Sequence, residues 1–265
     1  METSNARKSP PDGEARYLYC IAESRGEQDL GDIGIAGNGV YTIPCMGLAA
    51  VVHDCHGQAF EHGGKDEMKA CLLDHQRVVQ IAAERFGTVL PLGFGKIITG
   101  DEHKKPEEKV VDWLRSSFKD FEIKLKKVEG KAEYGVQVFW DVSLVTVRLL
   151  DEVPHIRTLS EEIKIKKAGT AFLYEEKLKK EIRLCLEDAA ARHYRTFYEK
   201  IKDVAEDVRV DKCHKTSDDR KMLLNVSCLL NDRQVESLGE MLDDITGQEG
   251  FSVRYTGPWP PYSFV

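Results

Sequence analysis

Hydrophobic and polar positions change their period several times along the chain, and each period predicts a kind of element. The first apolar run, YLYCIAE at residues 17–23, is a strand candidate. Residues 32–55 are punctuated by glycine and predict two strands, at 39–43 and 48–52, with a turn between them. The chain therefore opens with β-structure.

From Asp66 the apolar positions recur every three or four residues, which is typical of one face of a helix. That face consists of Met68, Leu72, His75, Val79 and Ala82, and the pattern stops at Gly87. A short buried strand or loop follows at residues 89–95, VLPLGFG, whose glycines permit a close backbone approach.

A second helix is expected to begin at Pro106, because proline suits the first helical position. Its apolar stripe consists of Val110, Leu114, Phe118, Phe121 and Leu125. The length favours two domains, and these elements predict an N-terminal α/β domain at residues 16–131. Residues 1–15 have no apolar signal region and are expected to be a disordered leader.

The rest of the chain predicts elements in the order β, α, β, β, α, β. The strands are expected at 134–141, 207–211, 222–230 and 251–255, and the turn Lys215–Arg220 makes the middle two a hairpin. The first helical region is broken near Pro154 and Gly169 and runs mainly from Thr170 to Ala205, and the second is capped by Asn231 or Asp232. This order predicts an α+β protein with a ferredoxin-like domain at 132–256, a fold that many unrelated functions use.

Composition narrows the class of protein. A hydrophobic fraction of 42% and a charged fraction of 31% are ordinary for a folded chain, and a net charge of -7 makes nucleic acid an unsuitable partner. The basic clusters Lys124–Lys127 and Lys164–Lys167 lie beside acidic residues, so we interpret them as solvated helix faces. No run approaches the roughly 20 apolar residues of a membrane span. Seven scattered cysteines without a signal peptide predict free thiols in a reducing cytoplasm.

Two segments contain residue types that bind metals or phosphates. His53, Cys55 and His56, with Cys45 and His62 nearby, are metal-ligand types, but their spacing matches no zinc signature. Loop histidines without a metal are the favoured interpretation. The glycines of Gly34–Gly39 lack the Lys-Ser/Thr of a phosphate loop, so a turn between strands is favoured.

The search for catalytic residues ends without a candidate. Cys20, Cys71 and Cys228 lie in apolar stretches and are expected to be small core residues, and His75 is expected to be a hydrogen-bonded core histidine. The pairs Glu161–Glu162 and Glu175–Glu176 are neighbours on helices, so their members point about 100° apart and are solvated charges. The sequence predicts no enzyme, and no catalytic, cofactor or metal residue. A Cys–His pair that meets only in space stays an alternative.

The last nine residues, GPWPPYSFV at 257–265, are unusually stiff and apolar. Prolines cannot donate ladder hydrogen bonds, so the chain is expected to leave the sheet at Gly257 in an extended form. Trp259, Tyr262 and Phe264 are then expected to pack on the body of the protein. A docking peptide for a partner is the alternative.

These motifs together resemble the gas vesicle protein GvpL/GvpF family. The resemblance rests on YLYCIAE near the start, on His75 followed by VLPLGFG, and on the terminal GPWPPYSF, and it spans residues 17–265. Three positions depart from the family pattern: Cys20 where glycine is common, Gly93 where arginine is frequent and Lys96 where threonine is common. Contacts of that loop therefore cannot be carried over from the family.

The resemblance implies an accessory protein of gas vesicle formation, located in the cytoplasm or on the vesicle. Its implied partners are the small hydrophobic shell protein GvpA and other accessory Gvp proteins, with no nucleic acid, no membrane and no cofactor. A small-molecule or metal-binding regulatory protein on a ferredoxin-like scaffold is the alternative from another class.

Overall fold

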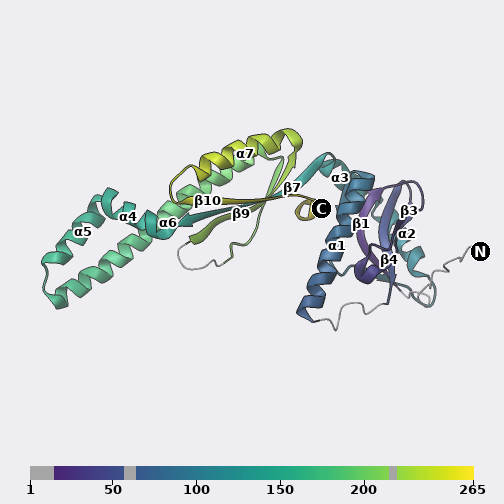
Figure 1. Ribbon diagram of the computed structural model, residues 1–265, viewed down its shortest axis with the longest axis horizontal. Helices are drawn as coiled ribbons and strands as arrows, with labels where there is room; N and C mark the ends of the chain where they lie inside the picture. The colour runs from purple at the N-terminus through teal and green to yellow at the C-terminus, as the bar shows by residue number, and fades with distance from the viewer. Residues whose placement is uncertain (1–14, 57–63, 215–219) are drawn as a thin grey trace, which may run out of the picture. The chain divides into compact units, whose positions relative to one another are not determined.

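The computed structural model describes residues 15–56, 64–214 and 220–265, which form a mixture of helices and sheets (Figure 1). The described residues up to Ala132, together with Trp259–Val265, form one compact unit, here unit 1, and Glu133–Pro258 form unit 2. The mixed helix-and-sheet class predicted from the sequence is confirmed. Of the leader expected at 1–15, residues 1–14 lie outside the described residues, and Ala15 is instead the buried first residue of strand β1 (Ala15–Glu23). Of the turn expected at 215–220, residues 215–219 lie outside the described residues, and Arg220 begins a strand. None of the helices in the described part of the chain has both the length and the apolar character needed to cross a membrane.

Unit 1 is a sheet with helices on both faces. Its elements are β1 (Ala15–Glu23), β2 (Asp29–Gly31), the 3-10 turn η1 (Ile35–Gly37), β3 (Val40–Cys45), β4 (Leu48–Cys55), α1 (Lys65–Phe86), β5 (Val89–Pro91), β6 (Ile97–Thr99), α2 (Pro106–Ser116) and α3 (Phe118–Val128). The strand order is β2-β3-β4-β1-β5, and β6 also pairs with β1. Strand β1 is antiparallel to β4, β5 and β6, so it is the strand around which the sheet is built.

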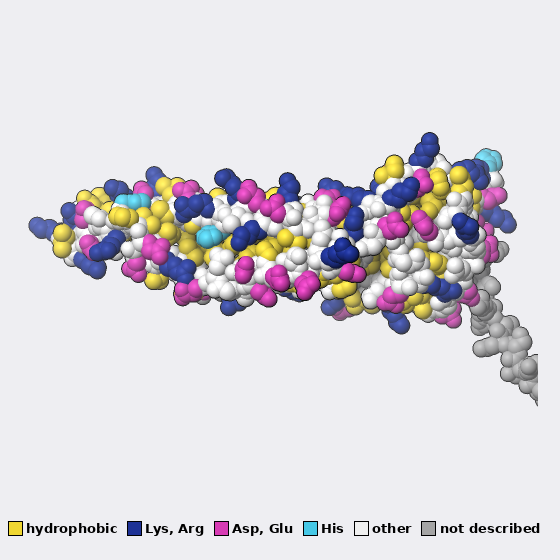
Figure 2. Space-filling model, turned by 90° about the horizontal axis from the view of Figure 1, so that it is seen from above, with side chains coloured by type: hydrophobic (Ala, Val, Ile, Leu, Met, Phe, Trp, Pro, Cys, Tyr) yellow, Lys and Arg dark blue, Asp and Glu magenta, His cyan; other side chains and the backbone are white. Residues whose placement is uncertain are grey.

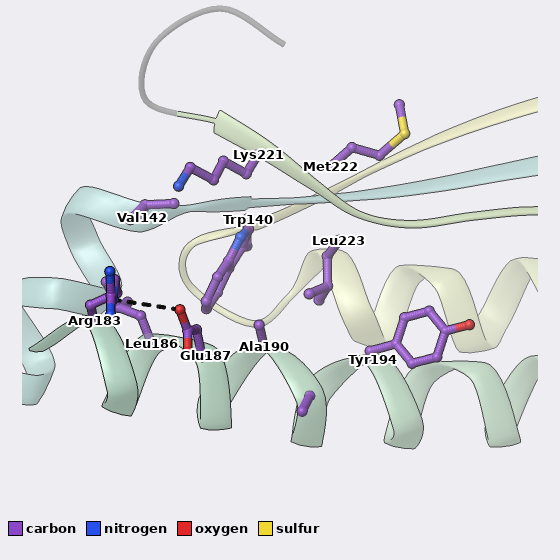
Figure 3. A pocket seen from close by; sticks show the side chains of 11 residues that line it. Trp140, Val142, Arg183, Leu186, Glu187, Ala190, Tyr194, Lys221, Met222 and Leu223 are labelled. Atoms are coloured by element: carbon purple, nitrogen blue, oxygen red, sulfur yellow. Dashed lines mark ion pairs between the residues drawn. The ribbon is translucent and has the colours of Figure 1, made fainter. Parts of the chain in front are cut away.

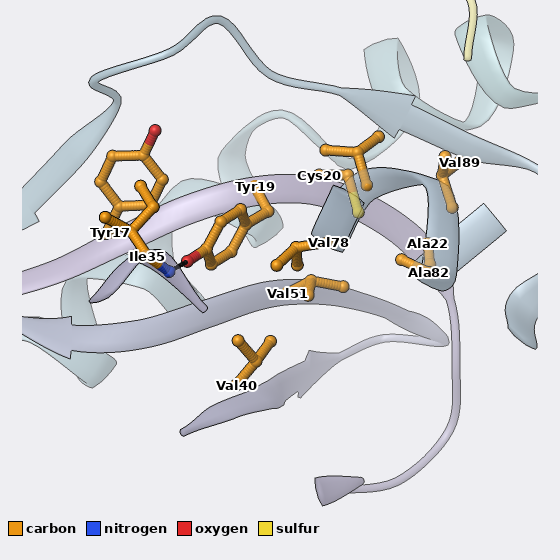
Figure 4. Close-up of a cluster of buried hydrophobic side chains, with 11 residues drawn as sticks. Tyr17, Tyr19, Cys20, Ala22, Ile35, Val40, Val51, Val78, Ala82 and Val89 are labelled. Atoms are coloured by element: carbon orange, nitrogen blue, oxygen red, sulfur yellow. Dashed lines mark hydrogen bonds between the residues drawn. The ribbon is translucent and has the colours of Figure 1, made fainter. Parts of the chain in front are cut away.

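Strand β1 is buried along its length, from Ala15 to Ala22, because α1 and α2 both pack against it. Its register with β4 shifts between Leu18 and Cys20, so Tyr19 is the extra residue of a β-bulge. On a regular strand, consecutive residues face opposite sides. The bulge instead lets Tyr19 and Cys20 enter the same hydrophobic cluster as Val78 of α1 (Figure 4).

Most predicted elements of unit 1 are present, with one correction. The single helix expected from Pro106 is two helices, α2 and α3, which meet at Ser117. Ser117 has φ -103° and ψ 9°, outside the helical range, although its N–H still donates to the Trp113 carbonyl at 3.0 Å. The three-residue strands β2 and β6 were not predicted.

Unit 2 contains one sheet and a helical arm. Its elements are β7 (Lys131–Asp141, whose first two residues belong to unit 1), α4 (Val142–Glu152), α5 (Pro154–Ile165), α6 (Ala168–Val204), β8 (Asp207–Val210), β9 (Arg220–Asn231), α7 (Asp232–Thr246) and β10 (Phe251–Trp259). The strand order is β10-β7-β9-β8. The helix break at Pro154 and the cap at Asn231, which accepts from two backbone N–H groups, are confirmed. The break expected near Gly169 is also present, at Lys166 and Lys167 just before α6.

The last residues differ in two ways from the expectation. Strand β10 does not end at Gly257 but continues to Trp259. Gly257 has φ +126°, and a Cβ there would lie 2.8 Å from the Glu133 carbonyl oxygen, so only glycine fits. The expectation that Trp259 is buried is wrong, because its exposed fraction is 51%.

The 3-10 turn η2 (Tyr262–Phe264) completes unit 1. Phe264 is 4% exposed, and the Lys127 ammonium lies 5.7 Å from the centre of its ring. The tail thus places one aromatic residue, Phe264, in the core of unit 1 and leaves another, Trp259, exposed.

We predict different costs for the two aromatic residues. Phe264→Ala removes a buried ring and should lower the free energy of unfolding of unit 1 by about 3 kcal/mol. Trp259→Ala, the matched control at an exposed position, should change it by less than about 1 kcal/mol. Urea denaturation, with hydrogen exchange of the β1 amides to identify the unit 1 transition, measures both. Equal small effects would show that the tail does not stabilise unit 1.

Candidate functional site

Segments far apart in the sequence meet around one buried histidine of unit 1. His75 of α1 is 1% exposed, and its Nε2 lies 3.1 Å from the Leu92 carbonyl oxygen. A carbonyl only accepts, so Nε2 carries the proton and Nδ1 is an acceptor. The Tyr17 hydroxyl donates to Nδ1 at 2.8 Å and accepts from the Gly95 N–H at 3.0 Å. A neutral imidazole, with one donor and one acceptor nitrogen, therefore satisfies both hydrogen bonds of the His75 ring.

A second tyrosine–histidine pair lies beside the first. His53 of β4 is 2% exposed, and its Nδ1 lies 2.7 Å from the Tyr19 hydroxyl oxygen. That oxygen already accepts from the Ile35 N–H at 2.9 Å, so the hydroxyl proton goes to His53, since a buried donor needs a partner. A Cβ on Gly34 would lie 2.9 Å from the same hydroxyl. The glycine segment is therefore the predicted turn, held against Tyr19.

The rings of these residues pack together. Tyr17 and His53 lie opposite each other on β1 and β4 and stack with ring centres 5.0 Å apart. Phe94 contacts the His75 ring at 5.8 Å, and Tyr262 of the tail lies 6.4 Å from it. We call Tyr17, Tyr19, His53, His75, Phe94 and Tyr262 the aromatic cluster. It joins the three segments on which the family resemblance rests.

Burial keeps the polar members of the aromatic cluster uncharged. It lowers the pKa of His53 to about 4, against a small opposing effect of Asp54, and it lowers the pKa of His75 despite the bond to Leu92. Burial also raises the pKa of Tyr17 to about 12 and that of Tyr19 above its ordinary value. The Nδ1 atoms of both histidines accept from tyrosine hydroxyls, and the His75 Nε2 donates to the Leu92 carbonyl, so these ring nitrogens are engaged inside the core. The aromatic cluster therefore stabilises the packing of β1 against α1 and β4.

The metal-ligand candidates are not brought together. No three His, Cys, Asp or Glu side chains within the described ranges gather closely enough to hold a metal ion. His53 is not the loop histidine that was expected, because it lies in β4 and accepts from Tyr19. His56 is exposed, Cys45 and Cys55 are half-buried free thiols, and His62 lies outside the described residues.

The remaining candidates have mainly structural environments. Cys20 and Cys228 are buried and His75 is a hydrogen-bonded core residue, as predicted. Cys71 of α1 is half-buried and packs against the hydrophobic core cluster of unit 1, at its edge and not inside it. Of the glutamate pairs, Glu161 pairs with Arg157 and Glu176 with Lys179 on exposed helix surfaces.

Unit 2 carries a groove that sequence reasoning missed. Its volume is about 550 Å³, and it lies between α6 and the sheet (Figure 3). Trp140 of β7 and Leu223 of β9 point toward α6 across it. The helix side contributes Arg183, Leu186, Glu187, Ala190, Ala191 and Tyr194. A largely apolar groove with few charged groups suits the docking of apolar side chains better than catalysis.

The family comparison agrees with the resemblance in the sequence. A family model described as gas vesicle synthesis protein GvpL/GvpF matches residues 15–265. Gas vesicle protein L1 of Halobacterium salinarum is 28% identical over 272 residues, covering 99% of this chain and 94% of that protein. Gas vesicle protein L of Haloferax mediterranei is 29% identical over 304 residues, covering 100% and 92%.

Two crystal structures have a similar fold. Gas vesicle protein GvpF from Anabaena sp. PCC7120 aligns with a TM-score of 0.73 at 19% identity, covering 95% of this chain and 98% of that one. GvpF from Microcystis aeruginosa aligns with a TM-score of 0.64 at 18% identity and the same coverage. At these identities the likeness concerns the fold.

We predict that unit 1 loses stability in mild acid. Unfolded histidine has a pKa of about 6.5, whereas His53 is held at about 4. As the pH falls between these values, the unfolded chain binds a proton that native His53 does not bind. This residue alone therefore lowers the free energy of unfolding by about 3 kcal/mol. Urea midpoints from pH 7 to 4 measure the loss. A midpoint that does not fall would contradict the neutral cluster.

The Tyr19 hydroxyl can be tested separately. Tyr19→Phe leaves the Ile35 N–H and the His53 Nδ1 without their partner, so we expect a loss of about 2 kcal/mol in the stability of unit 1. Tyr255→Phe, at a half-exposed position of unit 2, should cost less than about 0.5 kcal/mol. The free energies from urea denaturation of both variants decide whether the hydroxyl stabilises the fold.

Proposed function

The chain belongs to the GvpL/GvpF family of gas vesicle synthesis proteins, and from this we propose that it binds the hydrophobic shell protein GvpA and other accessory vesicle proteins during vesicle assembly. The match over residues 15–265 carries the proposal. The relatives described above are named as gas vesicle proteins and not as enzymes.

A physical problem of vesicle assembly explains why such a binder is needed. A shell subunit that faces gas exposes apolar surface, so its unassembled form is prone to aggregate. A charged binder that covers this surface can hold the subunit and release it to a growing shell. With a net charge of -7, complexes of this chain repel one another, which opposes aggregation of the bound form.

Two surfaces of unit 2 offer binding modes. Strand β10 lies at one edge of its sheet and could accept an added strand from a partner. The α6 groove could accept a helix or single apolar side chains. Of the two modes we favour helix packing in the groove. Pro258 donates no backbone hydrogen bond, so β10 is a poorer edge for an added strand.

We further propose a two-domain organisation, with an α/β domain at 16–131 and a ferredoxin-like domain at 132–256. In a split βαβ unit, a third strand lies between two strands that helices connect. The position of β9 between β7 and β8 supports this. Residues 257–265 would then be a tail packed on the body, a proposal that burial of Phe264 supports. The working location proposed is the cytoplasm and the vesicle surface.

Affinity capture from the host during vesicle production tests the function. We expect the tagged chain to recover the shell protein and other accessory vesicle proteins, identified by mass spectrometry. A matched tagged protein without vesicle function measures the background. Recovery of none of them while vesicles form would contradict the proposal. A small molecule retained through purification in its place would favour a regulatory protein that uses the α6 groove.

A holding role also predicts an effect on the shell protein itself. Co-production with this chain should increase the fraction of the shell protein that stays in the supernatant after centrifugation, because its apolar surface is covered. An unchanged fraction would contradict holding.

A further inference from the structure

The end of the helical hairpin formed by α5 and α6 exposes three large apolar side chains. Ile165 is 81% exposed, Leu173 67% and Phe172 60%. Apolar side chains that gather on an exposed surface commonly mark a contact with another molecule. We call Lys164–Lys167 together with Phe172 and Leu173 the hairpin tip.

The hairpin tip is also basic. Lys164, Lys166 and Lys167 are exposed, and residues 163–174 contain no Asp or Glu. In the part of the chain that the structure describes, no carboxylate forms an ion pair with these lysines, and Lys166 lies over the Tyr174 ring at 5.0 Å. Figure 2 shows Lys and Arg side chains beside hydrophobic ones at the left end. The three lysines make the tip complementary to an acidic segment of a partner, although the chain as a whole is acidic.

Helix α6 connects the hairpin tip to the groove. Eleven residues make about three helical turns, so Phe172, Arg183 and Tyr194 lie on one side of α6. Arg183 and Tyr194 line the groove, and Trp140 and Leu223 stand across from them (Figure 3). At about 1.5 Å per residue, this side of α6 extends about 33 Å from Phe172 to Tyr194.

We propose that the hairpin tip and the α6 groove together bind one amphipathic α-helix of another vesicle protein, with its acidic end at the tip. This inference rests on the proposed function. A helix carries apolar side chains in a row at three- and four-residue spacing, which matches anchors at Phe172 and in the groove on one side of α6. Leu173 lies about 100° around α6 from Phe172 and widens the apolar surface at the tip. Its acidic residues would pair with the three lysines, which fixes the direction of the helix.

Two other occupants fit the same surface less well. An added strand needs unpaired backbone groups, which the interior of a helix such as α6 does not offer. An anionic lipid surface would attract the lysines and the apolar tip but has no element that enters the groove. Dependence on the groove as well as on the tip therefore identifies a helix.

Three variants of the full chain test the proposal by quantitative capture of the shell and accessory vesicle proteins. Phe172→Asp with Leu173→Asp should lower recovery of one vesicle protein at least about tenfold, as expected for a central apolar anchor. Ala190→Glu in the groove should lower recovery of the same protein. Leu73→Asp, the matched control on the 55% exposed Leu73 of α1, should not. Circular dichroism melts confirm that each variant folds.

The lysines have their own readout. Zero-length carbodiimide cross-linking should join Lys164, Lys166 or Lys167 to Asp or Glu residues at one end of a helix in the captured protein. Lys→Gln at all three positions should remove these cross-links and the decrease of recovery with rising salt.

The outcomes separate this inference from the proposed function. If the wild-type chain captures no vesicle protein, the proposed function fails and the inference fails with it. If it captures them and the tip and groove variants do so equally well, only the inference is overturned. Cross-links to an extended strand would overturn the helix as occupant. Flotation of the chain with vesicles of equal phosphatidylglycerol and phosphatidylcholine, lost on changing the tip but not the groove, would assign the tip to a lipid surface instead.

Discussion

Unit 1 depends on the need to satisfy the hydroxyl groups of two tyrosines on a strand that is buried on both faces. A buried hydroxyl without a partner costs free energy, so each must meet a donor or acceptor from elsewhere. The partners of Tyr17 come from α1 and from the loop after β5, and those of Tyr19 come from β4 and η1. Satisfying two side chains therefore fixes the positions of four other segments. Burial in the same cluster explains why the two histidines are neutral.

Local patterning was sufficient for the long elements. The three- and four-residue period predicted α1 and α6, and apolar runs predicted β1 and β9. Strands of three residues are too short to show a period, so β2 and β6 were missed and β5 was expected only as a strand or a loop. The break at Ser117 is a change in backbone angles, and the apolar stripe continues across it. The stripe therefore could not indicate the break. Strand β10 was expected to end before Pro258 but includes it, because an edge strand tolerates a residue that donates no hydrogen bond.

The sites were less predictable, because they depend on pairs distant in the sequence. The helical period placed His75 in the core, but Tyr17 lies 58 residues away and no spacing rule connects the two. The identity of an apolar residue does not show whether the rest of the chain covers it. Trp259 was therefore expected to be buried, and the exposure of Phe172 was not predicted. The groove combines β7, β9 and α6, and only the fold brings these together.

Unit 1 is discontinuous along the chain, since Trp259–Val265 belong to it although 126 residues of unit 2 precede them (Glu133–Pro258). Unit 2 is therefore an insertion, and its two ends lie on the neighbouring strands β7 and β10, as an insertion requires. During synthesis from the N-terminus, residues 15–132 emerge long before Phe264 can fill its place. The first unit to appear is thus the last to be completed, and a fragment cut after Ala132 would lack part of its own core.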